Sequence, residues 1–244
     1  MKAIILAAGR GTRISRYLSG KPKCTVDIGD EILIEYTVKL LQKKGISNIA
    51  LVVGYNSKEI KNVLKDYDIK YYENPFYDVT NSIASLWFAK ECINDADDMI
   101  IMNGDVFIEE ALLDNIMMCN KSPVMFADNS RRECADYKFK YSNGILEKYG
   151  KELEGVDITG EYIGIGKFCK DFIREFYELL IYKIERQQHN VWWENILYDM
   201  VGSRKIYVEE VGGKFWAEVD YIEDYERILL HRGYKAEFDL RVHK

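Results

Sequence analysis

Short apolar runs alternate with amphipathic stretches through the first half of the chain. The runs have the length of buried strands, and the stretches between them repeat their apolar positions at helical spacing. The pattern predicts strands at 3–6, 48–53, 69–72 and 99–102 and helices at 32–44, 57–65 and 81–91. Strands and helices that alternate in this way are typical of a parallel sheet with crossover helices.

The pattern changes beyond residue 105. Residues 134–168 form short, tyrosine-rich segments punctuated by glycine, which predict antiparallel strands or a lid. The other expected elements are helices at 110–119, 170–186, 192–201 and 222–231 and strands at 124–127, 206–210 and 215–220. The predicted fold class is therefore α/β, with a mostly parallel, Rossmann-like central sheet, helices on both faces and a small antiparallel and helical part.

We expect a single domain over residues 1–244. The hydrophobic content of 48% is enough for a full core, only three prolines occur, and no low-complexity linker divides the sequence. A net charge of -6 argues against nucleic acid as the main partner, because binding to a phosphate backbone needs a basic face. A cluster of arginines and lysines in such an acidic protein instead suggests a pocket for a small anion.

The cysteine and hydropathy patterns predict a cytoplasmic protein. Its five cysteines are irregularly spaced and contain no C-x-x-C pair, which favours neither a disulfide framework nor a thiolate metal site. The apolar start at 3–8 is too short for an export signal, and no run reaches membrane-spanning length. We therefore expect no membrane partner.

A glycine-rich loop directly follows the first predicted strand. Gly9 and Gly11 offer backbone N–H groups to a phosphate, because glycine lets the main chain approach closely. A dinucleotide-binding loop, G-x-G-x-x-G, would need a third glycine where Ile14 stands, and no phosphate-binding G-x-x-x-x-G-K occurs. The loop also carries more positive charge than a pyrophosphate at a helix N-terminus needs, from Arg10, Arg13, Arg16, Lys21 and Lys23.

The loop resembles the signature of the nucleotidyltransferase family, L-A-A-G-x-G-T-R followed by P-K. The matching residues are Leu6, Ala7, Ala8, Gly9, Arg10, Gly11, Thr12 and Arg13, then Pro22 and Lys23. The resemblance implies that residues 6–12 hold the base and phosphates of a nucleoside triphosphate, that Arg13 contacts the phosphate chain, and that Lys23 is the main catalytic cation. Arginine suits a forked phosphate contact and lysine a point charge at the transferred group. The alternative is a charged loop on the surface.

Two aspartates are candidates for binding Mg²⁺. Nucleotidyl transfer gathers negative charge on the transferred phosphate and on departing pyrophosphate, so a divalent cation is needed beside the lysine. Asp105 follows a predicted strand, at the carboxyl edge where open sheets bind ligands. The resemblance carries the family's metal pair onto Asp105 and Asp220. Either aspartate alone is more often a turn residue, and three nearby acids compete with Asp220 for this role, namely Glu218, Glu223 and Asp224.

No histidine is required by this chemistry. The attacking phosphomonoester is mostly dianionic at pH 7, because its second pKa is about 6. His189, His231 and His243 form neither a metal-binding nor a triad pattern. On this interpretation residues 1–105 mainly bind the nucleotide, and residues 106–244 mainly bind the acceptor and complete the metal site.

The identity of the nucleotide depends on residues farther along the chain. Candidates for contacting the base and ribose are Gly54, Tyr55, Asn81, Ser82 and Ser85, although Tyr55 fits a packing role equally well. The spacing of the elements and the closing run at 207–225 resemble the small bacterial cytidylyltransferases that activate phosphocholine or a related metabolite. That resemblance implies CTP.

The acceptor site is expected in the second half, which is rich in aromatic residues. Choline enzymes use aromatic rings because a quaternary ammonium binds to their faces. Tyr137 stands where the phosphocholine enzymes carry tryptophan, and the neighbouring arginines suit a carboxylate, so we favour phosphoglutamine, with CDP-glutamine as product, as in capsule or surface polysaccharide modification. The predicted acceptor-binding residues are Arg131, Arg132, Tyr137, Trp192 and Trp193, with Tyr162, Trp216 and Tyr221 as further aromatic candidates. Packing on a helix face is, however, the commoner fate of a Trp-Trp pair.

The leading hypothesis is a Mg²⁺-dependent cytidylyltransferase that joins CMP to a small phosphorylated amine or amino acid and releases pyrophosphate. Phosphocholine stays open as the acceptor. The alternatives are a hexose-1-phosphate nucleotidyltransferase, a nucleotide-binding regulator without activity, and a dinucleotide-dependent oxidoreductase. The presence of Lys23, Asp105 and Asp220 argues against the regulator. The sequence does not indicate the oligomeric state.

Overall fold

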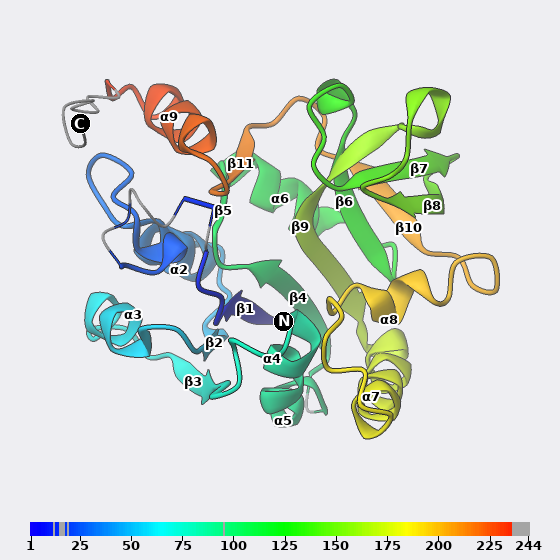
Figure 1. The fold of residues 1–244 in the computed structure, drawn as a ribbon, viewed down its shortest axis with the longest axis horizontal. Coiled ribbons are helices and arrows are strands. Elements are labelled where there is room, and N and C mark those ends of the chain that lie inside the picture. The colour runs from blue at the N-terminus through cyan, green and yellow to red at the C-terminus, as the bar shows by residue number, and fades with distance from the viewer. Residues whose placement is uncertain (12, 15–17, 19, 95, 236–244) are drawn as a thin grey trace.

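A mixed nine-stranded sheet crosses the molecule in the computed structural model, with the strand order β3-β2-β1-β4-β9-β6-β10-β8-β7 (Figure 1). The structure describes residues 1–11, 13, 14, 18, 20–94 and 96–235. The strands of this sheet are β1 (Lys2–Ala7), β2 (Asn48–Val53), β3 (Lys70–Glu73), β4 (Asp98–Asn103), β6 (Val124–Asp128), β7 (Lys138–Ser142), β8 (Ile145–Gly150), β9 (Gly160–Cys169) and β10 (Tyr207–Glu210). The α-helices are α2 (Leu33–Lys43), α3 (Ser57–Val63), α4 (Ser82–Phe88), α5 (Lys90–Asn94), α6 (Glu110–Met118), α7 (Lys170–Glu185), α8 (Asn195–Tyr198) and α9 (Ile222–His231).

The first half of the chain forms the parallel side of the sheet, as predicted. β1 lies between β2 and β4 and runs parallel to both, with Lys2 opposite Asn48 on one side and Met99 on the other. β3 continues the sheet parallel to β2. The carboxyl ends of β1 and β4 therefore meet at one edge of the sheet, which is where open α/β sheets bind ligands.

The second half makes the sheet mixed, so the prediction of a mostly parallel sheet is correct for β1 to β4 and for the parallel pair of β6 and β10, but not for the strands around them. β9 runs antiparallel to β4 on one side and to β6 on the other, and β7 and β8 pair antiparallel to each other. β9 is buried over almost its whole length. A strand buried on both faces has a nearly continuous apolar sequence, which is also typical of a parallel strand, so the pattern does not reveal its direction.

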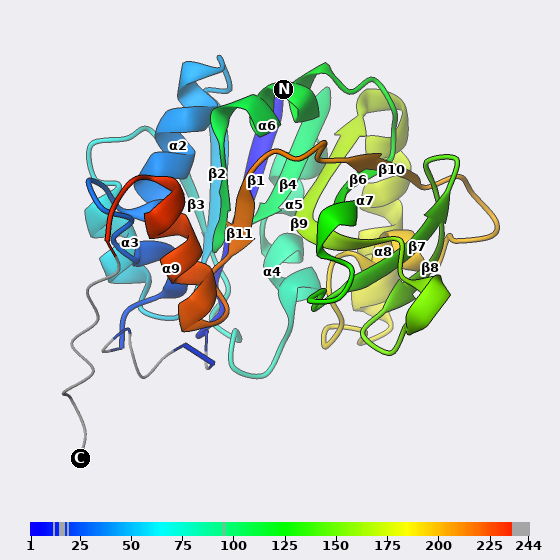
Figure 2. The same cartoon turned by 90° about the horizontal axis from the view of Figure 1, so that it is seen from above.

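Apolar layers cover both faces of the sheet, because successive side chains of a strand point to opposite sides. Ile4 and Leu6 of β1 pack in the layer beneath α4, α5, α7 and α8. Ala3 and Ile5 pack in the layer beneath α2, α3 and α6. Figure 2 shows α2 and α7 on opposite sides of the sheet, which agrees with the predicted helices on both faces.

A second, small sheet joins two distant parts of the chain. β5 (Val106–Ile108) pairs antiparallel with β11 (Trp216–Glu218). The backbone N–H of Val219 donates to the carbonyl of Asp105 at 2.9 Å. Asp105 and Asp220 are thereby brought to neighbouring positions, although they lie far apart in the sequence. The strand β5 was not predicted, because three residues are too few to show an alternating pattern.

Two predicted helices differ from the structure. The helix expected at 81–91 is divided into α4 and α5, and the helix expected at 192–201 contains only the four residues of α8. The apolar spacing around α8 reflects side chains buried from turns, including Trp193. Among the described residues, no helix combines the length and the apolar character needed to cross a membrane.

Candidate active site

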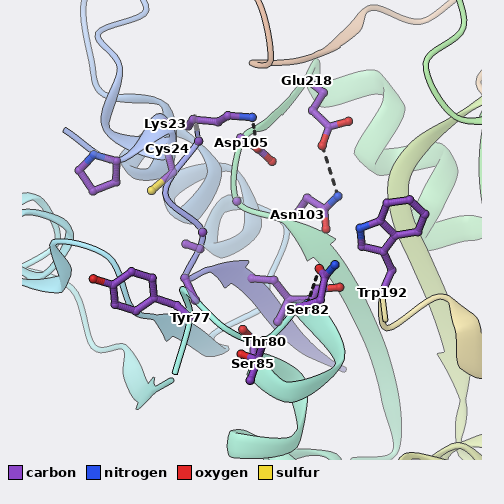
Figure 3. A pocket seen from close by; sticks show the side chains of 18 of the residues that line it. Lys23, Cys24, Tyr77, Thr80, Ser82, Ser85, Asn103, Asp105, Trp192 and Glu218 are labelled. Atoms are coloured by element: carbon purple, nitrogen blue, oxygen red, sulfur yellow. Dashed lines mark hydrogen bonds and ion pairs between the residues drawn. The ribbon is translucent and has the colours of Figure 1, made fainter. Parts of the chain in front are cut away.

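Two adjoining cavities of about 260 and 440 Å³ form a cleft at the carboxyl ends of β1 and β4, and Figure 3 shows the smaller of them. The smaller cavity is lined by the end of β1, the glycine loop, the start of α4 and the segment that follows β4. The larger one extends toward residues 136–164 and 192–198. The residues that line both are Gly11, Lys23, Asn81, Asn103, Asp105, Trp192, Glu194 and Glu218.

The glycine loop needs its two glycines for different reasons. Gly11 has a φ of +65°, a left-handed conformation that other residues rarely adopt, and the side chain of Lys23 fills the space where a Cβ would lie. A Cβ added at Gly9 would meet nothing within 4 Å. The bare backbone at Gly9 therefore faces open space in the cavity, as expected of a position that a ligand approaches closely.

Gly54 and Tyr55 lie next to the glycine loop and line neither cavity. The backbone N–H of Tyr55 donates to the carbonyl of Ala8 at 3.0 Å, and its hydroxyl donates to the carbonyl of Gly20 at 3.0 Å. The guanidinium of Arg10 lies 5.4 Å from the centre of the Tyr55 ring. These residues are placed to hold the loop in position, whereas direct contact with a base or ribose was predicted for Gly54 and Tyr55.

The start of α4 contributes three polar side chains to the smaller cavity. The side chain of Asn81 accepts a hydrogen bond from the backbone N–H of Ser82 at 2.7 Å and so caps the helix. The hydroxyl of Ser82 accepts a bond from the backbone N–H of Trp193 at 2.9 Å. The hydroxyl of Ser85 accepts a bond from Asn74 at 3.0 Å. All three predicted residues, Asn81, Ser82 and Ser85, thus lie in the cleft.

A cluster of charges occupies the junction of the two cavities. The ammonium of Lys23 lies 3.3 Å from a carboxylate oxygen of Asp105 and also forms an ion pair with Asp220. Arg13 pairs with the second carboxylate oxygen of Asp220 at 2.5 Å and lies 3.6 Å from Asp136. Burial disfavours the charge of Lys23, but Asp105 and Asp220 outweigh that effect and hold the pKa of Lys23 above its usual value.

A third acid, Glu218, lies beside this cluster. Asn103 donates a hydrogen bond to its carboxyl group at 3.4 Å, and Figure 3 shows the two side chains pointing toward each other. Burial, together with the charges of Asp105 and Asp220, raises the pKa of Glu218 well above its ordinary range. Glu218 is one of the three acids predicted as alternatives to Asp220 as a metal ligand.

Asp105 and Asp220 fit a Mg²⁺ site. Both carboxylates reach the same ammonium group, so both are within reach of one cation. Mg²⁺ prefers oxygen ligands and is commonly held by one or two carboxylates together with substrate phosphates and water. Within the part of the chain that the structure describes, no three His, Cys, Asp or Glu side chains are grouped as a metal site. The arrangement suits a metal whose coordination the substrate completes.

Aromatic rings wall the larger cavity on the side of residues 136–164 and 192–198. The rings of Tyr137 and Trp192 meet edge to face with centroids 5.3 Å apart, and Tyr137 stacks on Tyr198 at 5.7 Å. Trp192 is 41% exposed, which leaves part of its ring open to the cleft. Glu194 lies in the same wall, and burial raises the pKa of its carboxyl group to about 8.

Comparison with known proteins identifies the family of the chain. A family model described as the MobA-like NTP transferase domain matches residues 3–187. The chain belongs to this family. The matched region contains the glycine loop, Lys23 and Asp105, whereas Glu194, Glu218 and Asp220 lie beyond it.

Similar proteins match nearly the whole chain. A CTP:phosphoglutamine cytidylyltransferase from Campylobacter jejuni is 30% identical, with 93% of this chain and 98% of the relative covered. A choline-phosphate cytidylyltransferase from Streptococcus pneumoniae is 28% identical, with 93% and 96% covered. The solved structure of the CTP:phosphocholine cytidylyltransferase from Streptococcus pneumoniae matches with a TM-score of 0.78 at 24% identity, over 95% of this chain and 98% of that one. The resemblance to nucleotidyltransferases is therefore confirmed, and the structural match shows the shared fold.

The predicted acceptor residues are only partly gathered in the cleft. Tyr137 and Trp192 line the larger cavity. The prediction that Trp193 binds the acceptor is wrong, because Trp193 is fully buried and packs against Phe168 and Phe176. It therefore has no surface to offer a ligand. The Trp-Trp pair thus divides, with one ring in the cleft and the other in the core.

The two arginines expected to bind a carboxylate do not line the larger cavity. Arg131 forms an ion pair with the buried Glu161 at 2.8 Å, and it lines another cavity, of about 80 Å³, that Asp220 also borders. Arg132 is exposed and donates to the carbonyl of Asn129 at 3.1 Å. Their positions favour a structural role for Arg131 and a surface position for Arg132. Three residues of the sequence argument lie outside the described residues, namely Thr12, Arg16 and His243.

Sequence reasoning missed Asn103 and Glu194. Asn103 is the last residue of β4, and its position just before Asp105 at the end of a buried strand was a usable signal. Glu194 follows two tryptophans, and an acidic residue within an apolar run was a weaker signal. Its burial becomes visible only in the folded chain.

Proposed function

We propose that the protein is a Mg²⁺-dependent cytidylyltransferase that transfers CMP from CTP to a small phosphorylated amine or amino acid. The observation that carries this proposal is the composition of the cleft. A glycine loop, a partly buried lysine and two convergent aspartates lie beside an aromatic wall that contains a buried carboxyl group. The choice of CTP is supported by the 30% and 28% identical relatives, both named as cytidylyltransferases.

In the proposed reaction, a phosphate oxygen of the acceptor attacks the α-phosphorus of CTP. A new P–O bond forms, the bond from the α-phosphorus to the bridging oxygen breaks, and pyrophosphate leaves with that electron pair. No residue has to remove a proton, because the acceptor phosphate is mostly dianionic at pH 7, with a second pKa of about 6.

The residues of the charge cluster have distinct tasks in this reaction. Lys23 and Arg13 neutralise the negative charge that builds up on the phosphates in the transition state. Asp105 and Asp220 would hold Mg²⁺, which supplies further charge neutralisation at the triphosphate. The glycine loop binds the nucleotide through its backbone N–H groups.

The charges of the larger cavity favour an acceptor with a cationic group. Three basic side chains, Arg13, Lys23 and Lys151, face six acidic ones. The acidic residues are Asp105, Asp136, Glu161, Glu194, Glu218 and Asp220. An ammonium group is attracted both by carboxylates and by the faces of aromatic rings. We therefore assign the ammonium of the acceptor to Glu194, Trp192 and Tyr137.

We favour phosphoglutamine over phosphocholine as the acceptor. An amino acid carries a carboxylate in addition to its ammonium group, and Lys151 is a basic residue of the larger cavity that lies outside the charge cluster. It pairs with Asp136 at 2.7 Å, and both side chains are partly exposed, so the pair opens at little cost. Lys151 takes over the task that the sequence suggested for Arg131 and Arg132. A role in capsule or surface polysaccharide modification rests on the family resemblance alone.

Release of pyrophosphate tests the proposal. The protein is incubated with Mg²⁺, each nucleoside triphosphate and each of three acceptors, namely phosphoglutamine, phosphocholine and a hexose 1-phosphate. We expect turnover with CTP and phosphoglutamine. Turnover with phosphocholine alone would reassign the acceptor, turnover only with a hexose 1-phosphate would favour the sugar enzymes, and nucleotide binding without turnover would favour a regulator.

A pair of lysine variants tests the mechanism. Lys23→Ala should lower kcat by roughly 10² to 10³, the loss typical of a group that stabilises transition-state charge. Lys21→Ala is the matched control, because Lys21 is an exposed lysine two residues away and lines neither cavity. Full activity of Lys23→Ala would show that the assigned mechanism is wrong.

A further inference from the structure

The ammonium group of Lys23 occupies the position of a cation between two carboxylates. Its side chain is 12% exposed, and those of Asp105 and Asp220 are 22% and 17% exposed. Lys23 contacts Oδ1 of Asp220, while Arg13 contacts Oδ2 of the same carboxylate at 2.5 Å. Both oxygens of Asp220 therefore already have a positively charged partner from the chain itself.

These are the same oxygens that a divalent metal would need. A carboxylate oxygen that accepts a charged hydrogen bond is a weaker metal ligand while that bond lasts, and a cation of the chain repels an incoming cation. Among the described residues, no three His, Cys, Asp or Glu side chains are grouped as a metal site, and the nearby Glu218 accepts a hydrogen bond from Asn103. The two aspartates therefore already hold cations of the chain and need further ligands from elsewhere to bind a metal.

The side chains of Lys23 and Arg13 can both move away from Asp220. The stem of Lys23 lies against Gly11 of the glycine loop, so phosphates bound by that loop lie within reach of the same ammonium group. The side chain of Arg13 is 42% exposed and can turn without disturbing the core. Phosphate oxygens are strong acceptors for both groups. Binding of a triphosphate therefore offers Lys23 and Arg13 new partners and releases Asp220.

We propose that Lys23 and Arg13 act as built-in counterions that close the metal site of the free protein and open it when the nucleotide binds. The inference rests on the proposed function in taking Asp105 and Asp220 as the metal ligands and the glycine loop as the nucleotide site. Because coupling between two ligands is reciprocal, the metal strengthens nucleotide binding by the same factor by which the nucleotide strengthens metal binding. Lys23 thus has two tasks, one toward the phosphates and one toward the carboxylates.

Titration of the free protein with Mn²⁺, followed by the electron paramagnetic resonance signal of unbound Mn²⁺, tests this proposal without any nucleotide. We expect Lys23→Met to bind Mn²⁺ on the order of tenfold more tightly than the wild type, since a neutral side chain no longer competes for the two carboxylates. Lys23→Arg keeps the charge and should bind as weakly as the wild type. Lys21→Met is the control for loss of a lysine elsewhere on the loop.

A double variant locates the effect. Adding Asp220→Asn to Lys23→Met should abolish the gain, because it removes one of the two ligands. Equal affinity of the wild type and Lys23→Met would overturn the proposal, and so would a gain that persists in the double variant.

One further variant keeps the test decisive. Removal of Lys23 takes away the ion pair of the partly buried Asp105, which can prevent folding. Arg13→Met removes the more exposed cation and should also tighten Mn²⁺ binding, by a smaller factor, and the absence of any gain in every folded variant would overturn the proposal. This test and the test of the proposed function can fail independently. If the protein does not use CTP but Lys23→Met still binds Mn²⁺ more tightly, the counterion proposal stands and the proposed activity is wrong.

Discussion

Replacement of Glu194 by glutamine should make the stability of the protein less dependent on pH. Glu194 is 6% exposed, and burial raises the pKa of its carboxyl group from an ordinary 4.5 to about 8. The folded protein therefore binds this proton more tightly than the unfolded chain does. That contribution to stability is complete below pH 4.5 and is lost as the pH rises through about 8.

The magnitude follows from the size of the shift. One pKa unit corresponds to about 1.36 kcal/mol, so the interval from 4.5 to about 8 corresponds to at most about 5 kcal/mol in the free energy of unfolding. Rotation of the side chain or entry of water reduces this value, because both restore solvent to the ionised group. Glutamine has nearly the same shape and does not titrate, so the variant keeps the packing and lacks the pH-dependent part.

Urea unfolding at pH 5, 7 and 8.5 measures the effect. The free energy of unfolding of the wild type, minus that of Glu194→Gln, should fall by several kcal/mol between the lowest and the highest pH. Glu178→Gln is the matched control, because Glu178 is an exposed glutamate whose removal should leave this difference constant. Parallel pH profiles for the wild type and Glu194→Gln would refute the buried, proton-binding carboxyl group.

The remaining predictions concern one buried lysine and two glycines. Lys167 is 3% exposed and donates to three carbonyl oxygens near the end of α6, so Lys167→Met should lower the free energy of unfolding by about 2 to 4 kcal/mol in urea, whereas the exposed Lys170→Met should change it by less than about 0.5 kcal/mol. A Cβ at Gly104 would lie 2.9 Å from the Cβ of Ala7, so Gly104→Ala should destabilise the protein by about 1 to 3 kcal/mol and lower kcat by displacing Asp105, the next residue. Gly9→Ala meets no atom within 4 Å and should leave the melting temperature unchanged, yet weaken CTP binding in a calorimetric titration. Unchanged CTP affinity in Gly9→Ala would show that no ligand approaches this backbone.

Local patterns predicted the parallel half of the fold well. β2 occupies the predicted range of Asn48–Val53, and β1 and β4 extend the predicted strands by one or two residues. These strands are short apolar runs bounded by polar residues, so their local sequence contains the information. The pairing of β5 with β11 and the direction of β9 depend on contacts between distant segments, which no local pattern records.

The site residues could be predicted where they belong to a sequence motif. They could not be predicted where only the folded structure determines whether a side chain reaches the cleft. Lys23 and Asp105 were found from the loop signature and from a strand end, and the structure places them 3.3 Å apart. Trp192 and Trp193 look equivalent in sequence, yet one borders the cleft and the other fills the core. Arg131 was expected to meet a substrate, but Glu161 already neutralises it. Such outcomes are set by partners from other elements.

The two ends of the cleft differ in the chemical groups that they can bind, and this difference bears on the choice of acceptor in the proposed function. The end with Lys23 and the glycine loop suits phosphates, and the end with Trp192 and Glu194 suits a cation. With a pKa of about 8, Glu194 is mostly protonated at pH 7 when the cleft is empty, and an incoming ammonium group favours its ionised form. An acceptor without an ammonium group, such as a hexose 1-phosphate, gains no such ion pair and meets only a protonated carboxyl group. If the proposed function is correct, we expect Glu194 to favour acceptors that carry an ammonium group as well as a phosphate.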